Sequence, residues 1–291
     1  AAGAIGIIML TSVAGNNWHP WASAQIKRFF VGFALMISIA MVPIWFWKSM
    51  SVLAYITSLG LLVLVEFFGS TGMGAQRWLD LGFITLQPSE MAKITLIMVL
   101  AFYYDWLPDQ HVSKPQWIIA PLAIIFLPFF LVLLQPDLGT SLLIVIGGGV
   151  MMFLAGVHWG YFGLALSLSV GGILTILYSR GTDWQLLNEY QYRRIDTFLD
   201  PSSDPLGAGY HITQSKIALG SGGWTGRGFG QGTQSRLNFL PEKHTDFIFT
   251  TLAEEFGFIG GISLLAVYAL IVAFAIIAAI RNKDRFSSLL F

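Results

Sequence analysis

The chain has 291 residues, of which 55% are apolar and only 11% are charged, and its mean hydropathy is +0.68. A soluble domain carries about a quarter charged residues, so this composition excludes an ordinary soluble protein. The formal net charge is zero and no basic stripe is present, which excludes a nucleic-acid partner.

Long stretches without Asp, Glu, Lys or Arg predict membrane-spanning helices, because a helix needs roughly 20 apolar residues to cross a bilayer. The longest stretch, Leu138–Ser179, is long enough for two helices, with Gly156-Val-His-Trp-Gly160 as the turn between them. In chain order, the eight expected spans lie near residues 1–14, 29–47, 50–68, 88–106, 117–134, 138–156, 161–179 and 247–280. We therefore expect an all-α polytopic integral membrane protein, with residues 1–291 forming a single transmembrane domain.

Short basic loops predict the orientation of the spans. Lys48, Lys114 and the segment 281–285 fall on one side of the membrane if the spans alternate, whereas Lys27 and Arg28 fall on the other. Cytoplasmic loops carry the excess of Lys and Arg. The majority therefore places the 281–285 side in the cytoplasm and the long 180–246 loop outside.

The 180–246 loop is the candidate functional region. It holds 14 of the 32 formal charges, and its middle, residues 220–232, has seven glycines in thirteen positions. Glycine lets backbone N–H groups approach a ligand closely. The segment favours a tight re-entrant outer loop, with a cradle for an anionic lipid headgroup as the alternative. A nucleotide site is not expected, since no βαβ unit surrounds these glycines.

Charged residues also occur inside the predicted spans. Glu90 and Lys93 open the fourth span three residues apart, so they share a helix face and can pair. The pair is either a structural ion pair or part of a functional cavity, because ionisable groups in a span face the bundle interior. For the neighbours Glu254 and Glu255, we expect that at least one lies at the membrane interface.

Asp246 stands where the polar loop enters the last apolar helix. In one interpretation Thr245 is the N-cap of this helix, and the carboxylate suits the positive end of the helix dipole. In the other interpretation Asp246 is a general base at the membrane–water boundary. Residue spacing alone does not decide between them.

A set of motifs in fixed order between about residue 70 and residue 261 resembles the shape, elongation, division and sporulation (SEDS) family. They are Gly74-Ala-Gln-Arg-Trp-Leu-Asp-Leu-Gly82, Gln87-Pro-Ser-Glu-Met-Ala-Lys93, Gln135-Pro-Asp-Leu-Gly-Thr-Ser141, Leu199-Asp-Pro-Ser-Ser-Asp-Pro-Leu-Gly-Ala-Gly-Tyr-His211, Gln214-Ser-Lys216, Gly232-Thr-Gln-Ser235, Phe239-Leu-Pro-Glu-Lys-His-Thr-Asp-Phe-Ile-Phe249 and Glu254-Glu-Phe-Gly257. The amino-acid sequence of the loop is more similar to that of the elongation members of this family than to that of its division members.

The resemblance implies about ten transmembrane helices, two of which would follow the present chain, and a glycosyltransferase in the bacterial inner membrane that polymerises lipid II. It implies Asp246 as the catalytic residue and the pair Glu90 and Lys93 in the fourth helix. With these, the candidate substrate-binding residues are Glu90, Lys93, Arg77, Lys216, Arg227, Lys243 and His244. We also expect Lys93 to share a cavity with Asp246.

No cofactor is required by the sequence, and no His, Asp and Glu cluster has metal-ligand spacing, although a divalent cation (Mg²⁺ or Mn²⁺) would suit a pyrophosphate substrate. The partners implied by the resemblance are lipid II, a class B penicillin-binding protein with a single transmembrane helix, and other membrane proteins of the elongation complex. The alternatives are a lipid II flippase and a non-catalytic scaffold for the penicillin-binding protein. Polar residues crowd the outer half of the chain, which favours the enzyme.

Overall fold

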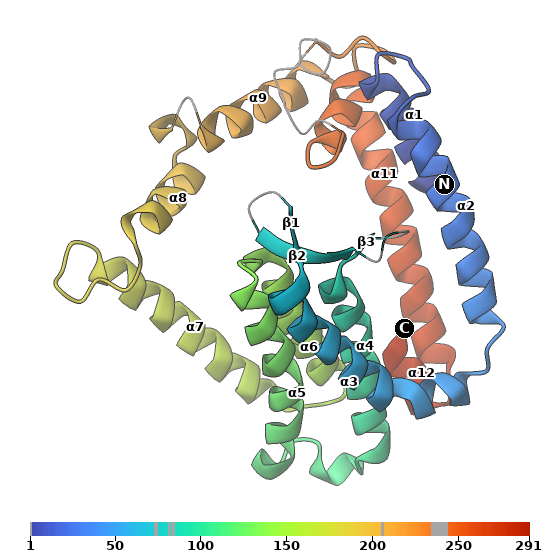
Figure 1. Cartoon of the computed structure of the whole chain (residues 1–291), viewed down its shortest axis with the longest axis vertical. Helices are drawn as coiled ribbons and strands as arrows, with labels where there is room; N and C mark the ends of the chain where they lie inside the picture. Colours follow the sequence, from blue (N-terminus) through green and yellow to red (C-terminus); the bar gives the residue numbers. More distant parts are fainter. Residues whose placement is uncertain (1, 73–74, 81, 83–84, 205–206, 234–243) are drawn as a thin grey trace. The chain divides into compact units, whose positions relative to one another are not determined.

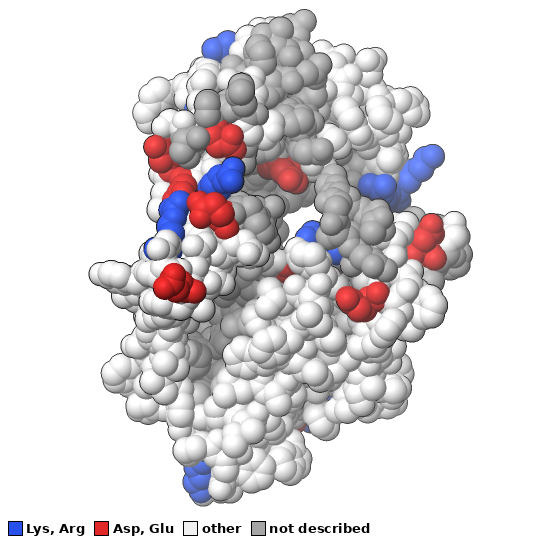
Figure 2. All heavy atoms as spheres, turned by 60° about the vertical axis from the view of Figure 1, so that its left-hand side comes forward, with Lys and Arg blue, Asp and Glu red and all other residues white. Residues whose placement is uncertain are grey.

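The computed structural model describes residues 2–72, 75–80, 82, 85–204, 207–233 and 244–291. The chain is mainly helical (Figure 1) and divides into two compact units. One unit comprises residues 1–39 and 169–274, and the other comprises residues 40–168 and 275–291. Most of the face in Figure 2 carries neither acidic nor basic side chains, as expected for a protein surrounded by lipid.

The second unit is built on a bundle of α3 (Ile44–Phe68), α4 (Pro88–Trp106), α5 (Pro115–Leu134) and α6 (Leu138–Leu154), to which the short α12 (Arg285–Leu290) adds on α4. Its core consists of fully buried aliphatic and aromatic side chains, among them Leu62, Leu96, Leu100, Tyr104 and Phe286. α5 and α6 approach closely at Gly148, where a Cβ atom would lie 2.5 Å from Ile125 Cγ1.

Two prolines inside α5 shape the packing of this bundle. Pro121 and Pro128 have no backbone N–H, so each leaves the carbonyl four residues earlier without its helical partner. Tyrosine hydroxyls from neighbouring helices take over: Tyr103 Oη donates to Trp117 O and Tyr55 Oη donates to Ile124 O, both at 2.8 Å. α3 and α4 are thereby joined to the two weak points of α5.

A small antiparallel sheet connects α3 to α4. β1 (Ser70–Gly72), β2 (Ala75–Asp80) and β3 (Thr85–Leu86) pair in the order β1-β2-β3, with Leu79 opposite Leu86. The expected all-α fold is therefore incomplete. Glycines at both ends of β1–β2 end the helical pattern, and eleven residues of the 69–87 segment between α3 and α4 form these strands instead.

The first unit contains α1 (Ala2–Val13), most of α2 (Trp21–Ala40), the end of α7 (Trp159–Ser179), α8 (Glu189–Leu199), α9 (Ala208–Ser221) and most of α11 (Ile248–Arg281). α8 begins with a capping box between Asn188 and Gln191. Tyr192 of α8 is buried and its hydroxyl bonds Ser179 Oγ and Ile176 O, which fixes the corner between α7 and α8. Pro201–Ser203 of this unit forms a short 3-10 turn, and so does Asp109–His111 of the other unit.

Among the described residues, five helices are long and apolar enough to cross a membrane: α2, α3, α5, α7 and α11. α1 and α6 are shorter apolar helices, and α4 carries charges at both ends. One expected span is misplaced, because the 29–47 stretch is divided between α2, which ends at Ala40, and α3, which begins at Ile44. Pro43 stands directly before α3, and the residue before a proline disfavours helical backbone. The expected turn at 156–160 is confirmed, with Gly156 at φ +96°.

Candidate functional site

Asp246 lies in a turn over residues 244–247, immediately before α11, and its side chain is exposed. The interpretation of Thr245 as N-cap with Asp246 in the first helical turn is therefore wrong by two residues. Two residues earlier, His244 stacks on Trp21, the first residue of α2, with ring centroids 4.7 Å apart and planes inclined by 12°. This stack braces the turn that carries Asp246.

α11 is broken at Gly257, whose φ of 68° and ψ of −163° are not helical. The break removes intrahelical hydrogen bonds, and the glycine-rich segment 220–232 replaces them with four backbone bonds. Arg227 N and Gly228 N donate to the carbonyls of Glu254 and Glu255, each at 3.0 Å. In return, Phe258 N and Ile259 N donate to Gly223 O at 2.9 Å and Trp224 O at 3.1 Å. We call this arrangement the glycine clasp.

The glycines of the clasp are required by close backbone contact. A Cβ atom on Gly226 would lie 2.1 Å from Glu255 O, and one on Gly222 would lie 2.0 Å from Ala253 O. From the other side, a Cβ atom on Gly257 would lie 2.3 Å from Gly226 N. Gly226 and Gly257 also have positive φ. The segment is therefore as tight as expected, whereas its re-entrant position at the membrane stays a prediction.

Glu254 and Glu255 lie just before the break, and both are buried, with 0% and 2% of their surface exposed. Both side chains therefore face the protein interior, and the position of one of them at the membrane interface stays a prediction. Adjacent helical residues point to different sides, but here α1 covers one side and the clasp covers the other. Ser12 Oγ of α1 donates to Glu255 Oε1, and Thr233 Oγ1 donates to Glu254 Oε1 at 2.9 Å.

Arg227 projects from the clasp with an exposed side chain. Its Nε donates to Ser221 O at 3.3 Å and its Nη1 donates to Thr233 Oγ1 at 3.0 Å. Of the other predicted cations in this unit, Lys216 is exposed on α9, and Lys243 lies outside the described residues. The outer corner of α7 and α8 carries a separate charge pair, in which the Arg180 guanidinium lowers the pKa of Asp196.

The remaining predicted residues belong to the second unit. Glu90 and Lys93 form the expected ion pair at 2.8 Å in the first turns of α4, with 56% and 29% of their side chains exposed. Arg77 of β2 donates to Gln135 O and Pro136 O and lies 3.8 Å from the Asp137 carboxylate, so it ties the sheet to the start of α6. A shared cavity of Lys93 and Asp246 stays a prediction, because each residue belongs to a different unit.

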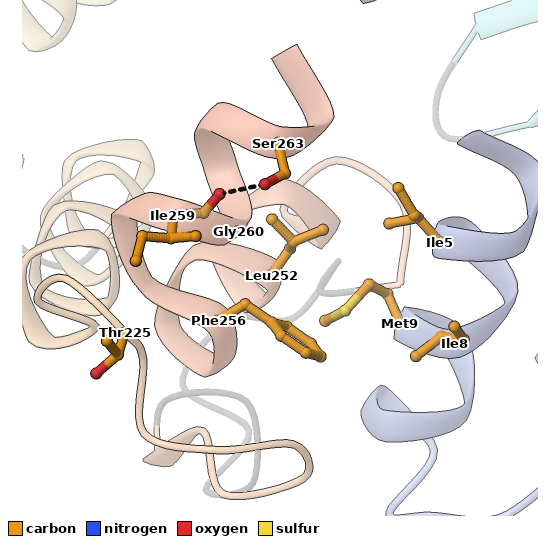
Figure 3. A pocket seen from close by; sticks show the side chains of 9 residues that line it. All are labelled: Ile5, Ile8, Met9, Thr225, Leu252, Phe256, Ile259, Gly260 and Ser263. Atoms are coloured by element: carbon orange, nitrogen blue, oxygen red, sulfur yellow. Dashed lines mark hydrogen bonds between the residues drawn. The ribbon is translucent and has the colours of Figure 1, made fainter. Parts of the chain in front are cut away.

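An apolar cavity of about 470 Å³ lies between α1 and α11. Figure 3 shows Met9 and Phe256 pointing toward each other across it, with Ile5 and Ile8 on the α1 side. Ser263 does not offer its hydroxyl to the cavity, because Oγ donates to Ile259 O of its own helix at 2.7 Å. The lining suits hydrocarbon rather than a sugar or a phosphate. In the part of the chain that the structure describes, no group of three or more His, Asp or Glu could hold a metal ion.

The model of the FtsW/RodA/SpoVE family of cell cycle proteins matches residues 2–291. The chain belongs to this family. It is 43% identical over 264 residues to the peptidoglycan glycosyltransferase MrdB of Escherichia coli K12, an alignment that covers 90% of this chain and 69% of MrdB. It is 36% identical over 287 residues to the probable peptidoglycan glycosyltransferase FtsW of Alteromonas naphthalenivorans, covering 96% of this chain and 54% of that protein.

Solved structures of FtsW/RodA/SpoVE proteins have the same fold. A chain of a peptidoglycan synthase complex superposes with a TM-score of 0.80 at 30% identity, covering 99% of this chain and 78% of that one. The rod shape determining protein RodA of Thermus thermophilus superposes with a TM-score of 0.67 at 24% identity, covering 99% of this chain and 75% of that one. The SEDS resemblance of the motifs is thus confirmed.

Sequence reasoning missed several residues that build the site of this FtsW/RodA/SpoVE chain. Trp21, Ser12 and Thr233 are an aromatic and two hydroxyl residues in stretches with no charge pattern. Thr233 lies within the motif Gly232-Thr-Gln-Ser235, but nothing in that motif indicates its bond to Glu254. The partners His244, Glu255 and Glu254 are more than 20 residues away in the sequence, so only the fold brings these pairs together. The run of glycines was the available signal, because glycine commonly occurs where another backbone segment approaches closely.

Proposed function

We propose that this chain is the membrane domain of a peptidoglycan glycosyltransferase that polymerises lipid II into glycan strands during cell elongation. The observation that carries the proposal is the position of Asp246. An exposed carboxylate stands at the entrance to α11, on a turn braced by Trp21 and His244, in a chain 43% identical to the peptidoglycan glycosyltransferase MrdB.

The proposed reaction needs one base. The 4-hydroxyl of one lipid-linked disaccharide transfers its proton to Asp246 while its oxygen forms a bond to the anomeric carbon of a second disaccharide. The bond between that carbon and the lipid pyrophosphate breaks, and the pyrophosphate leaves. A positioned carboxylate contributes about 10²–10⁴-fold to such a step. Direct attack inverts the anomeric centre.

Positive groups have the task of stabilising the leaving pyrophosphate, which is a good leaving group and needs charge rather than a strong acid. Arg227 and Lys216, both exposed in the same unit as Asp246, are suited to this. We include Arg77, Lys93, Lys243 and His244 in the substrate site on the family resemblance. A divalent cation, Mg²⁺ or Mn²⁺, bound with the pyrophosphate is part of the proposal.

The partner in this proposal is a class B penicillin-binding protein with a single transmembrane helix. Support comes from the structural similarity to a chain of a peptidoglycan synthase complex. The protein would be a multi-pass protein of the bacterial cytoplasmic membrane with its 180–246 loop outside, where it meets lipid II. A flippase would instead move lipid II without extending glycan strands, so polymerisation decides between the two.

The test is polymerisation of purified lipid II by the full-length protein together with its transpeptidase partner. We expect Asp246→Asn to reduce glycan synthesis by about 10²–10⁴-fold, because the amide cannot accept the hydroxyl proton. Asp183→Asn is the matched control, since Asp183 is an exposed acidic residue of the same loop. Near-normal synthesis by a folded Asp246→Asn protein would exclude Asp246 as the base, and lipid II transport without synthesis by the wild type would favour the flippase.

A further inference from the structure

Arg227 is connected to Glu254 through its backbone and, by way of Thr233, through its side chain. Its backbone N donates to Glu254 O at 3.0 Å, and its guanidinium Nη1 donates to Thr233 Oγ1 at 3.0 Å. The Thr233 hydroxyl in turn donates to Glu254 Oε1 at 2.9 Å. One buried residue therefore sets both the backbone and the side chain of an exposed arginine.

The direction of the hydrogen bonds in this chain of groups is fixed by chemistry. A guanidinium has only donors, so the Thr233 oxygen must accept from Arg227. The single hydroxyl proton of Thr233 is then left for Glu254, whose Oε1 must accept it. Hydrogen bonds in such a series polarise one another, and a charged group at an end shortens and strengthens them.

Glu254 has no exposed surface, although a buried carboxylate is costly unless it is hydrogen-bonded. Packing alone would be served better by an apolar side chain at this position. Its second oxygen lies beside Gly232, where a Cβ atom would come within 2.9 Å of Oε2. The carboxylate therefore occupies a space shaped for it, in line with Thr233 and Arg227.

The Arg227 guanidinium is held in place by these contacts, but they do not occupy all of its N–H donors. Two of its N–H groups, on Nε and Nη1, donate to described residues, and the side chain remains exposed. A guanidinium has five N–H donors in a planar fork that matches phosphate oxygens. The bonds from Nε and Nη1 together fix the plane of the guanidinium, so the N–H groups of Nη2 point in a fixed direction, which lowers the entropy lost on binding.

We propose that Glu254 and Thr233 are positioning residues that hold Arg227 ready to bind the pyrophosphate of a lipid-linked sugar. The inference rests on the proposed function for its substrate class. It assigns a role to the first glutamate of the buried pair, and it explains why a hydroxyl residue, rather than an apolar one, follows Gly232.

Binding of farnesyl pyrophosphate to the full-length protein in detergent tests the proposal without requiring catalysis, with farnesol as the probe that lacks both phosphates. We expect Arg227→Ala to weaken binding of farnesyl pyrophosphate about tenfold and to leave farnesol unaffected, as for loss of a charged hydrogen bond. Thr233→Val should weaken binding of farnesyl pyrophosphate by roughly threefold or more. Thr233→Ser should restore binding because it keeps the hydroxyl. Thr175→Val is the matched control, since the Thr175 hydroxyl donates to Gly171 O of its own helix.

The double variant decides whether Thr233 acts through Arg227. If it does, Thr233→Val in the Arg227→Ala background has no further effect on binding, and the same non-additivity appears in the KM of lipid II polymerisation. Additive losses, or equal wild-type affinity for farnesyl pyrophosphate and farnesol, would overturn the proposal. A wild type that binds farnesyl pyrophosphate in the expected way but does not polymerise lipid II would contradict the proposed function alone. Glu254→Gln, which keeps an acceptor oxygen, should weaken binding less than Thr233→Val and serves if the valine variant does not fold.

Discussion

At the scale of single residues, the site depends on glycines, because a residue without a side chain is needed where two backbone segments touch. Gly222, Gly226 and Gly257 lie where backbone meets backbone, and any Cβ atom there would lie within about 2.5 Å of a main-chain atom. Gly257 also has a φ and ψ combination that belongs almost entirely to glycine. These positions tolerate no side chain, whatever its polarity.

We predict that Gly226→Ala and Gly257→Ala each lower the stability of the protein by about 1–3 kcal/mol, the typical cost of a strained backbone residue. Thermal unfolding in detergent measures this. Gly220→Ala is the control from the same glycine-rich segment, because nothing lies within 4 Å of its Cβ position. Equal unfolding temperatures for the three variants would show that the clasp does not hold α11.

Single residues also show where sequence reasoning ends. The position of Asp246 next to the last span was predictable from the change in polarity, and the Glu90–Lys93 pair followed from helical spacing. The burial of Glu255 was not predictable, because its partner Ser12 is 243 residues away. A break inside an apolar stretch leaves no mark in composition other than one glycine.

At the scale of helices, most of the expected spans correspond to helices of the structure, because charge-free stretches and helices coincide. α4 begins at Pro88 and ends at Trp106, as expected, since Pro suits the first helical position. The expected boundary near Lys48 is wrong, because Pro43, rather than the charged residue, separates α2 from α3. α8, α9 and the small sheet were missed, since polar loop sequence gives no strong apolar period.

The prolines of α5 lead to a prediction about the tyrosines that serve them. Tyr55→Phe and Tyr103→Phe should each cost about 0.5–1.5 kcal/mol of stability, because a carbonyl that lacks its helical donor then loses its substitute. Tyr104→Phe is the matched control. Tyr104 is fully buried, and its hydroxyl has no hydrogen-bond partner among the described residues.

Thermal unfolding of the three tyrosine variants in one detergent gives the comparison. Tyr104→Phe should unfold at or above the wild-type temperature, because it removes a buried polar group without removing a hydrogen bond. A Tyr104→Phe protein less stable than Tyr55→Phe and Tyr103→Phe would contradict the assignment of the substitute hydrogen bonds to Tyr55 and Tyr103.

At the scale of the whole molecule, the absence of cysteine makes the orientation in the membrane testable. A single cysteine at Asp183, in the long loop, should react with a membrane-impermeant maleimide on intact spheroplasts, because we expect this loop to be outside. A single cysteine at Lys283, after α11, should react only once the membrane is opened. Both positions are exposed, so access to the reagent depends on the side of the membrane. The opposite labelling pattern would invert the orientation expected from the basic loops.

The glycine clasp also has a consequence for how the protein is made. Residues 222–228 leave the ribosome before residues 254–259, with which they pair, so the glycine clasp cannot form until the start of α11 has been synthesised. Buried backbone groups must be hydrogen-bonded. The broken start of α11 can therefore complete its backbone hydrogen bonds only after the segment 222–228 has folded back onto it. In this chain, folding of that segment and completion of the helix that follows it are one step.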